Sequence, residues 1–528
     1  MILHKNKFLV ALVVICSIFF VIESHQAKQV GTIEEDEFKS LMTSVGFKEI
    51  TIDSISKKPI FSQEDFLKFN SLTEVVHKNI THESGNCILY DLTLHTWIKI
   101  FGFSLYTLRM LSLLFAVGII IIAFYLSDSL FNNKNTALLS SALLACDPSI
   151  LCYGTRVRTY AMATFLSLLA TLLFVKWIKS IDKNDKKKLF TNLSVAYGTI
   201  AGLAVLAHYF CFYILLIHFI FLIPHLLKAS IKNKLGLILP YVVLSLIVGT
   251  WIYIGGLEGF HYIAKGNEWH LSYAKGANKL TSMTQLTTID NTIAYIKKTA
   301  LAWSYNETYW YYFRFNIPMR YLLILFAIPV IFICSALFYL WRKKQNGIHL
   351  FYFLILLFLV GPSICIFLAF QSGHTASYND RYALMSLPYF TIVLAYGISQ
   401  LYNNTGFWKN TSVGLCIILA VNIVTTQKIY FDDIALQFKP HFQILNDSVQ
   451  KQLKETANFK NKMIEFPYPY MALKFNLSLS PTHRNIKQTI NYKIERNKIY
   501  LIDTITKKKS VLYEFPKDYN AVPVYHSE

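Results

Sequence analysis

Long apolar segments recur along most of the chain and are separated by short polar ones. Several of them approach the roughly 20 residues that an α-helix needs to cross a bilayer. The pattern predicts about eleven membrane-spanning helices, near residues 8–23, 107–127, 135–152, 159–178, 191–207, 209–227, 235–254, 318–340, 348–370, 382–400 and 411–426. Only 16% of the 528 residues are charged, against about a quarter in soluble globular chains. The sequence therefore predicts an all-α polytopic membrane protein.

Three polar segments are too long to be simple turns between helices. They cover residues 24–106, 255–317 and 427–528. The first ends in the amphipathic stretch "ILYDLTLHTWIKIFG", and the second is rich in Trp and Tyr. The third contains alternating runs such as "NKIYLIDTI" and "SVLYEF", which are typical of strands. We therefore expect a membrane domain, residues 1–426, followed by a small α/β domain in residues 427–528.

Basic residues account for the net charge of +20, and their placement decides what the charge means. A basic balance can indicate nucleic-acid binding. Here the clusters "KNDKKK" (183–188), "KASIKNK" (228–234) and "WRKK" (341–344) each lie between apolar segments, which is typical of cytoplasmic loops. Counting the spans from a cytoplasmic N-terminus puts the same clusters inside. The sequence therefore favours contact with anionic membrane lipids, excludes nucleic acid as the partner, and places the three long polar segments outside the cytoplasmic membrane.

The N-terminal segment has two interpretations. Basic residues followed by about 15 apolar ones resemble a signal peptide, but no clear cleavage site follows. We favour a retained first helix. Either interpretation places the chain from residue 24 onward on the outside.

Acidic residues concentrate at positions 34–37, in "GTIEEDEFKS", directly after the first apolar segment. A run of like charges is often only a solvated segment. Asp91 and His95 lie further along the same polar segment, at a spacing that suits a pair on one helix face. An active site at the acidic run requires partners on the same side of the membrane.

Arginine, tyrosine and histidine residues at the predicted outer ends of helices supply such partners. "YGTRVRTYAM" carries two arginines, "SYNDRYALMSLPYF" one, and "LAVLAHYFCF" a histidine between two spans. Each arginine on its own could simply extend toward lipid headgroups. Together with the acidic run they suit a reaction that needs a base for a hydroxyl and cations for a phosphate. No His or Cys cluster has metal-ligand spacing, which leaves the use of a divalent metal open.

These stretches occur in the order and spacing of a known family. After the acidic run come "GNCILYDLTLHTWIKIFG", "LRMLSLLFAVGIIIIAFYLSDSLF", "DPSILCYGTRVRTYAMA", "LAHYFCFYILLIHF" and "DRYALMSLPYF". In this order they resemble the C-type (GT-C) membrane glycosyltransferases, bacterial family 39-like, which are relatives of protein O-mannosyltransferases and of the transferase that adds aminoarabinose to lipid A. The resemblance is strongest over about residues 30–225.

The resemblance implies a GT-C fold and inverting transfer of a sugar from a polyprenyl-phosphate-linked donor to a hydroxyl of a lipid, glycan or protein acceptor. It implies that a carboxylate of the first outer segment is the general base, with Asp36 as first choice and Glu37 as second. The residues that it assigns to the donor phosphate and lipid are Arg156, Arg158, Tyr160, His208, Arg381 and Tyr382.

The chain departs from the family pattern at two places. The family's His-Pro-Pro is Gly-Asn-Cys here, at residues 85–87, so no role of that histidine carries over. An acidic residue that many relatives have two positions before Arg158 is Arg156 here. Asp147 remains as a second acid, or as a residue that caps a helix beside Pro148.

Two other functions are compatible with the pattern. A flippase or transporter of a lipid-linked glycan would place ionisable residues near mid-membrane and show internal repeats. The sequence shows neither feature. A glycan polymerase or ligase of the outer face would use a similar scaffold. The acidic pair at Asp36 and Glu37 favours a transferase over both.

Overall fold

The computed structural model of the protein describes residues 2–29, 35–46, 70–82, 86–182, 192–275, 284–303, 319–342, 347–404, 406–437, 462–466, 487–490, 498–506 and 508–514. They divide into two compact units. Unit 1 consists of Met1–His25, Ser84–Tyr90 and Arg109–Phe431. Unit 2 consists of Gln26–Glu83, Asp91–Leu108 and Asp432–Glu528.

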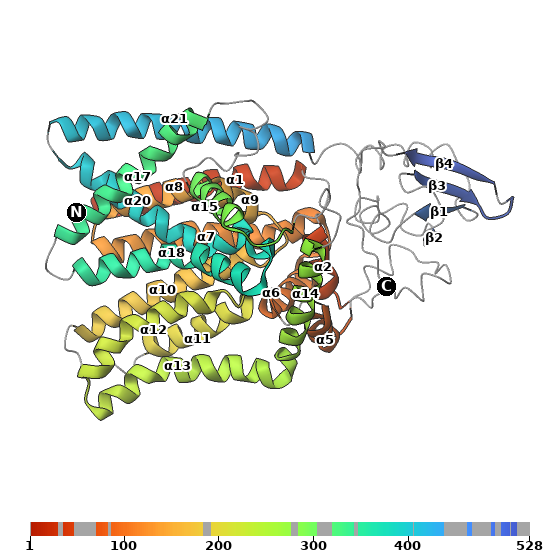
Figure 1. Ribbon diagram of the computed structural model, residues 1–528, viewed down its shortest axis with the longest axis horizontal. Coiled ribbons are helices and arrows are strands. Elements are labelled where there is room, and N and C mark those ends of the chain that lie inside the picture. Colours follow the sequence, from red (N-terminus) through yellow and green to blue (C-terminus); the bar gives the residue numbers. More distant parts are fainter. Residues whose placement is uncertain are drawn as a thin grey trace. The chain divides into compact units, whose positions relative to one another are not determined.

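Unit 1 is built of long helices, many of which lie side by side (Figure 1). In chain order its main helices are α1 (Ile2–Gln29), α7 (Leu105–Phe131), α8 (Lys134–Ala145), α9 (Pro148–Gly154), α10 (Tyr160–Asp182), α11 (Asn192–Ala207), α12 (Cys211–Lys228), α13 (Ile231–Trp251), α14 (Glu258–Lys275), α15 (Ile289–Trp303), α17 (Met319–Arg342), α18 (Gly347–Ser372), α19 (Asp380–Ala383), α20 (Leu387–Tyr402) and α21 (Phe407–Gln437). A π-helical turn, η2 (Ile252–Gly256), joins α13 to α14, and two 3-10 turns, η3 (Thr375–Ser377) and η4 (Leu384–Ser386), flank α19. The most extensive helix packing joins α11 to α10 and α13, and α17 to α20.

The helices confirm a multi-pass membrane protein. Within the described ranges, eight helices are long and apolar enough to cross a bilayer, and a ninth span results if the bent pair α8 and α9 counts as one. Two shorter apolar helices, Asn192–Ala207 and Ala327–Arg342, lie where two further spans were predicted. Each of the predicted spans therefore corresponds to a helix or to a bent helix pair.

The predicted helix at 135–152 is broken, because Asp147 and Pro148 end one helix and begin another. The two parts are bent by 60°. A residue before proline avoids the α conformation, and Asp147 is extended, with φ −78° and ψ 125°. Its carboxylate accepts hydrogen bonds from the amides of Ser149 (2.8 Å) and Ile150 (3.3 Å). Asp147 is therefore the N-cap of α9, as one of the two sequence interpretations proposed.

A buried polar network joins four helices inside unit 1. The Thr171 hydroxyl (α10) lies 2.6 Å from the Tyr389 hydroxyl (α20) and 3.0 Å from His218 Nε2 (α12). The other ring nitrogen of His218 lies 3.1 Å from the Tyr197 hydroxyl (α11). All four residues are buried. Polar side chains inside a membrane bundle must find partners within the protein, so the network joins these helices in one arrangement.

Three helices of unit 2 are joined by a second buried polar cluster. They are α2 (Glu35–Ser44), α5 (Leu72–His82) and the part of α6 (Ile88–Phe101) that follows Tyr90. The Asp91 carboxylate accepts hydrogen bonds from the Asn79 amide (2.7 Å) and the Ser44 hydroxyl (3.3 Å). His95 Nδ1 lies 2.7 Å from the Ser44 carbonyl oxygen. Asp91 and His95 therefore fix α2, the helix that carries the acidic pair.

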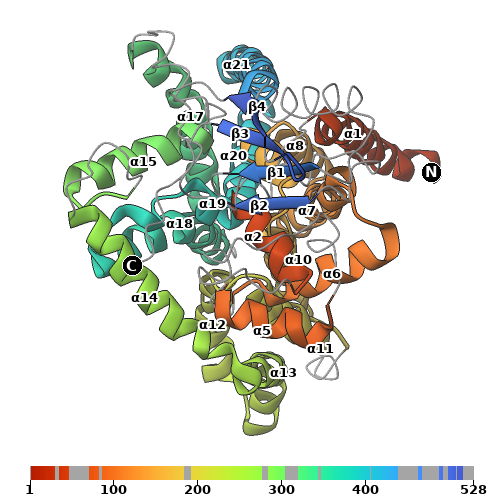
Figure 2. The same cartoon turned by 90° about the vertical axis from the view of Figure 1, so that its right-hand side faces the viewer.

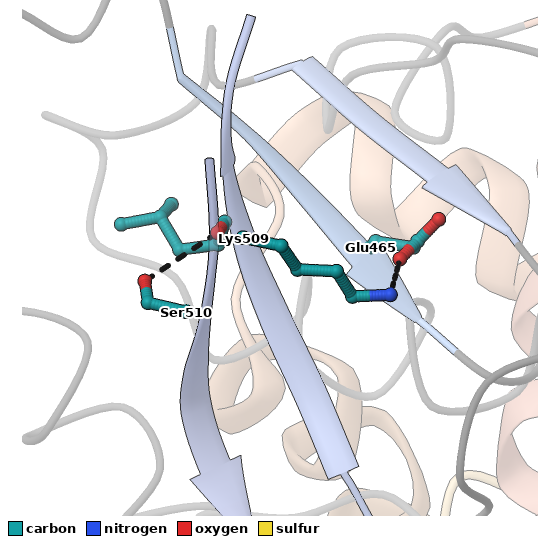
Figure 3. A network of polar contacts seen from close by, with 4 residues as sticks. Glu465, Lys509 and Ser510 are labelled. Carbon is teal, nitrogen blue, oxygen red and sulfur yellow. Dashed lines mark hydrogen bonds and ion pairs between the residues drawn. The ribbon is translucent and has the colours of Figure 1, made fainter. Parts of the chain in front are cut away.

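The described part of the C-terminal region forms a four-stranded sheet. Its strands are β1 (Lys462–Phe466), β2 (Lys487–Ile490), β3 (Lys498–Asp503) and β4 (Lys509–Glu514), in the order β2-β1-β3-β4. Only β1 and β2 are parallel. Lys509 of β4 reaches across β3, with its Nζ 3.9 Å from the centroid of the Tyr500 ring and 2.5 Å from Glu465 Oε2 of β1 (Figure 3). The alternating runs of the sequence are thus strands, and Lys509 of β4 contacts β1 through an ion pair and β3 through a cation–π contact.

Close helix packing at Gly397 gives a first prediction. A Cβ at this position of α20 would overlap the carbonyl of Phe332 in α17. Gly397→Ala is therefore expected to lower the stability of the protein by about 1–3 kcal/mol, measured as a lower thermal midpoint in detergent. The matched control is Gly414→Ala in α21, where a Cβ meets nothing within 4 Å. An equal midpoint for Gly397→Ala and the wild type would show that α17 and α20 are not packed this closely.

Candidate functional site

Three connections of unit 1, far apart in the sequence, bring the predicted phosphate-binding residues together. Arg158 lies in the bend before α10, and Tyr160 is the first residue of α10. His208 lies between α11 and α12, while Arg381 and Tyr382 belong to α19. The short α19 starts where Asn379 accepts a hydrogen bond from the Arg381 amide (3.3 Å). We call these five residues, Arg158, Tyr160, His208, Arg381 and Tyr382, the arginine cluster.

Two guanidinium groups lie against the same tyrosine ring in the arginine cluster. The guanidinium carbon of Arg158 is 5.8 Å from the centroid of the Tyr160 ring, and that of Arg381 is 5.6 Å from it. Arg381 also lies 5.2 Å from the Tyr382 ring centroid and donates from Nη2 to the Tyr382 hydroxyl (3.4 Å). These separations suit cation–π attraction. Two like charges therefore lie beside one aromatic ring.

Aromatic rings enclose the cluster. The His208 ring lies 5.8 Å from Tyr160 and 6.1 Å from Tyr382, measured between centroids. Phe210 lies 5.0 Å from Tyr382 and 5.1 Å from His208. Phe210 is not among the residues predicted from the sequence, although it follows His208 by two residues at the same connection. In the sequence, Phe210 is an aromatic residue at the outer end of a predicted span. Such residues are too common to indicate a functional site.

His208 is held as a neutral hydrogen-bond donor. Its side chain is buried, with 3% of its surface exposed. The Phe210 amide donates to His208 Nδ1 (3.1 Å), so a neutral ring carries its proton on Nε2. Burial, together with the charges of Arg158 and Arg381, lowers the pKa of His208 to about 3. At neutral pH the cluster therefore offers an N–H donor beside two guanidinium groups.

The stability of the protein is expected to fall at low pH because His208 is neutral in the folded state. An unfolded histidine takes up a proton below pH 6.5, whereas folded His208 does so only near pH 3. Lowering the pH from 7 to 5 should therefore lower the free energy of unfolding by about 2 kcal/mol, because over this range His208 takes up a proton only in the unfolded chain. In His208→Gln that part of the loss should be absent, which thermal midpoints at the two pH values measure. The exposed His261 gives the control His261→Gln; identical pH responses of His208→Gln and the wild type would contradict the neutral buried state.

Arg156 lies apart from the contacts that join the other two arginines. Its guanidinium carbon is 5.0 Å from the Tyr153 ring centroid, and Tyr153 lies 5.8 Å from Tyr160. Arg156 therefore lies over a different ring, which itself contacts Tyr160. Of the six residues predicted to bind phosphate or lipid, it is the one with this different environment.

The predicted bases lie on α2 of unit 2. Asp36 is partly exposed, and Glu37 is buried, with 3% of its surface exposed. Glu34 and the side chain of Glu35 lie outside the described part of the chain. Within the described residues, no group of three or more His, Cys, Asp or Glu side chains is arranged to hold a metal ion.

Comparison with known proteins identifies the fold. Residues 86–253 match the sequence profile of the family described as dolichyl-phosphate-mannose-protein mannosyltransferase. By sequence alone, no curated protein matches the chain. The solved structure of ArnT from Cupriavidus metallidurans bound to undecaprenyl phosphate is similar, with a TM-score of 0.51 at 10% identity, and the match covers 91% of this chain and 85% of ArnT. The chain has the fold of the C-type (GT-C) membrane glycosyltransferases.

Two further solved structures are similar to the chain, both with lower TM-scores. The apo form of the same ArnT has a TM-score of 0.50 at 9% identity, covering 90% of this chain and 85% of ArnT. The oligosaccharyltransferase of Archaeoglobus fulgidus, in complex with zinc and sulfate, has a TM-score of 0.43 at 16% identity, covering 78% of this chain. Our chain spans about half of that oligosaccharyltransferase, since the match covers 51% of its length.

The part of the chain that matches the family profile contains two of the three connections that form the arginine cluster. Arg158, Tyr160 and His208 lie within residues 86–253. Asp36 and Arg381 lie outside that range. The predicted C-type fold is thus confirmed, and the roles of these side chains are the subject of the proposal below.

Proposed function

We propose that the protein transfers a sugar from a polyprenyl-phosphate-linked donor to an acceptor hydroxyl at the outer face of the cytoplasmic membrane. The observation that carries the proposal is the arginine cluster, in which three distant connections of unit 1 converge. In this proposal residues 1–426 perform the transfer. Residues 427–528 form a domain outside the membrane, on the side opposite the basic loops.

The chemistry of the cluster favours a phosphate ligand. Two guanidinium groups, the Nε2–H of His208 and the Tyr382 hydroxyl offer hydrogen-bond donors to one region. Guanidinium groups bind phosphate through two parallel hydrogen bonds. A phosphate on a polyprenyl chain suits a cluster at the end of membrane helices, because its apolar tail can remain in the bilayer. ArnT, which has the same fold, has been solved with undecaprenyl phosphate bound.

The proposed reaction is a single displacement with inversion at the sugar. The carboxylate of Asp36, or of Glu37 as second choice, removes the proton of the acceptor hydroxyl. The acceptor oxygen forms a bond to the anomeric carbon, and the bond from that carbon to the phosphate oxygen breaks. The electron pair leaves with the polyprenyl phosphate, whose charge Arg158, Arg381 and His208 stabilise by preorganised donors. Arg156 and Tyr160 contribute to the same phosphate or its lipid.

Transfer from a radiolabelled polyprenyl-phosphate sugar tests the function. Purified protein in vesicles is supplied with the donor and with an extract of envelope lipids and glycans. Labelled acceptor together with released polyprenyl phosphate is the expected result. Movement of intact donor between leaflets without release of polyprenyl phosphate would instead identify a flippase. Lengthening of a lipid-linked glycan would identify a polymerase.

A further inference from the structure

The segment that precedes Arg381 is paired with the segment that precedes α15. Leu286 and His374 face each other in an isolated antiparallel bridge. The Thr287 amide donates to the Gly373 carbonyl (3.0 Å). Gly373 has φ +77°, a conformation that glycine adopts at little cost. Residues 285–287 and 373–375 thus pair in an isolated bridge just before α15 and just after α18, two helices that are labelled in Figure 2.

Side chains reinforce this pairing. The Thr375 amide donates to the Gln285 carbonyl (2.9 Å), and the Thr375 hydroxyl accepts from the Gln285 amide (2.9 Å). The Thr287 hydroxyl donates to the Ala369 carbonyl at the end of α18 (2.7 Å). The connection is therefore held by backbone and side-chain bonds together.

Tyr378 extends the pairing onto α15. Its hydroxyl lies 2.6 Å from the Thr292 hydroxyl. Its ring is stacked on that of the buried Tyr295, with centroids 4.6 Å apart and planes at 8°. We call residues 285–287, 373–375, Thr292, Tyr295 and Tyr378 the clasp.

Only a few bonded residues separate Tyr378 from Arg381. The Tyr378 amide donates to the Thr375 carbonyl (2.9 Å), and Asn379 then caps the Arg381 amide. The Tyr382 amide donates to the Asn379 carbonyl (3.1 Å). Tyr378 is therefore connected to Arg381 by a short turn that several backbone hydrogen bonds hold.

Arg381 needs such support because of its surroundings. Arg158 lies against the same Tyr160 ring, and like charges repel each other. A cluster that binds an anion gains affinity when its donors are held in place before the ligand arrives. We propose that Tyr378 is a positioning residue for Arg381, which the clasp holds against Tyr160 so that the cluster is preorganised for a lipid phosphate. The choice of a lipid phosphate as the ligand rests on the proposed function. The mechanical link between Tyr378 and Arg381 does not depend on it.

Hydrogen exchange without ligand tests the mechanical link. Tyr378→Phe removes one hydroxyl from the clasp, and Thr292→Val removes its partner. Each is expected to speed amide exchange in residues 373–383 by about 3- to 10-fold, as for the loss of one hydrogen bond. Tyr339→Phe is the matched control, because the Tyr339 hydroxyl pairs with Asn404, away from the clasp. Unchanged exchange in both clasp variants would overturn the inference, whatever the protein's function.

Affinity for undecaprenyl phosphate tests the consequence. Tyr378→Phe is expected to raise its Kd by about 3- to 10-fold, and to have no further effect in an Arg381→Ala background. Equal effects in both backgrounds would mean that Tyr378 acts on stability alone and would overturn the positioning role. If the wild type does not bind undecaprenyl phosphate, the proposed function fails, and the exchange experiment still decides the mechanical link.

A reversible cross-link tests whether the closed clasp is the binding form. Leu286 and His374 are a pair without hydrogen bonds between them, and such pairs suit a disulfide between strands. Oxidised Leu286→Cys/His374→Cys protein is expected to bind undecaprenyl phosphate as tightly as its reduced form. Loss of binding on oxidation, with recovery on reduction, would show that the clasp must open and would contradict the proposal.

Discussion

Asp36→Asn is expected to lower the rate of sugar transfer by about 10²- to 10⁴-fold and to leave the affinity for the lipid-phosphate donor unchanged. An amide cannot remove the proton of the acceptor hydroxyl, but it keeps the size of the carboxyl group. Donor affinity should persist because the donor phosphate is assigned to Arg158 and Arg381 in the other unit. The rate at saturating donor, and donor binding in the same preparation, measure the two effects.

The neighbouring acids provide the comparison. Glu37→Gln tests the second candidate, whose buried side chain differs from the partly exposed Asp36. Glu35→Gln is the matched control, since it removes the same charge from the same helix, α2. A full transfer rate in Asp36→Asn would remove Asp36 as the base. A loss confined to Glu37→Gln would assign the base to Glu37.

The framework of α2 makes this test interpretable. Ser44 at the end of α2 is tied to Asp91 and His95 of α6, and Asp91 is tied in turn to Asn79 of α5. None of these bonds involves the Asp36 side chain. Asp36→Asn therefore keeps these bonds of Ser44, Asp91 and His95, and amide exchange in α2 of the variant checks that the helix stays in place.

Much of the fold could be predicted from the sequence because membrane helices have a simple signal. A long apolar segment specifies a span whatever its neighbours are, since every backbone polar group must be satisfied within the segment. The break at Asp147 was less visible, because the apolar residues continue on both sides of the Asp-Pro pair. There the local backbone preference of a residue before proline overrides the hydrophobic pattern.

The arginine cluster could be predicted in part, and the clasp could not. Arg158, Arg381 and His208 are polar residues at predicted span ends, where they stand out. The clasp depends on backbone bonds between residues 285–287 and 373–375, which leave no trace in residue type. The tautomer of His208 depends likewise on the Phe210 amide. Pairing of this kind becomes visible only when the chain is folded.

Arg381→Ala is expected to weaken the binding of undecaprenyl phosphate by about 10- to 100-fold. Hydrogen bonds to charged groups contribute about 1.5–3 kcal/mol, and each 1.4 kcal/mol changes a dissociation constant tenfold. Arg381→Lys keeps the charge but loses the planar fork that holds two phosphate oxygens. Its affinity should therefore lie between those of the wild type and Arg381→Ala. Equilibrium binding to the purified protein at constant salt measures all three.

Variants of Arg158 and Arg156 test whether the arginine cluster, rather than the overall positive charge, binds the phosphate. Arg158→Ala should weaken binding as strongly as Arg381→Ala, because both guanidinium groups lie against Tyr160. Arg156→Ala removes the same charge from the same bend, but Arg156 lies over Tyr153 instead, so we expect its contribution to be smaller, with a rise in Kd of less than about 3-fold. Equal losses in all three variants would mean that only the overall positive charge matters. Losses confined to Arg158→Ala and Arg381→Ala would assign the phosphate to the two guanidinium groups beside Tyr160.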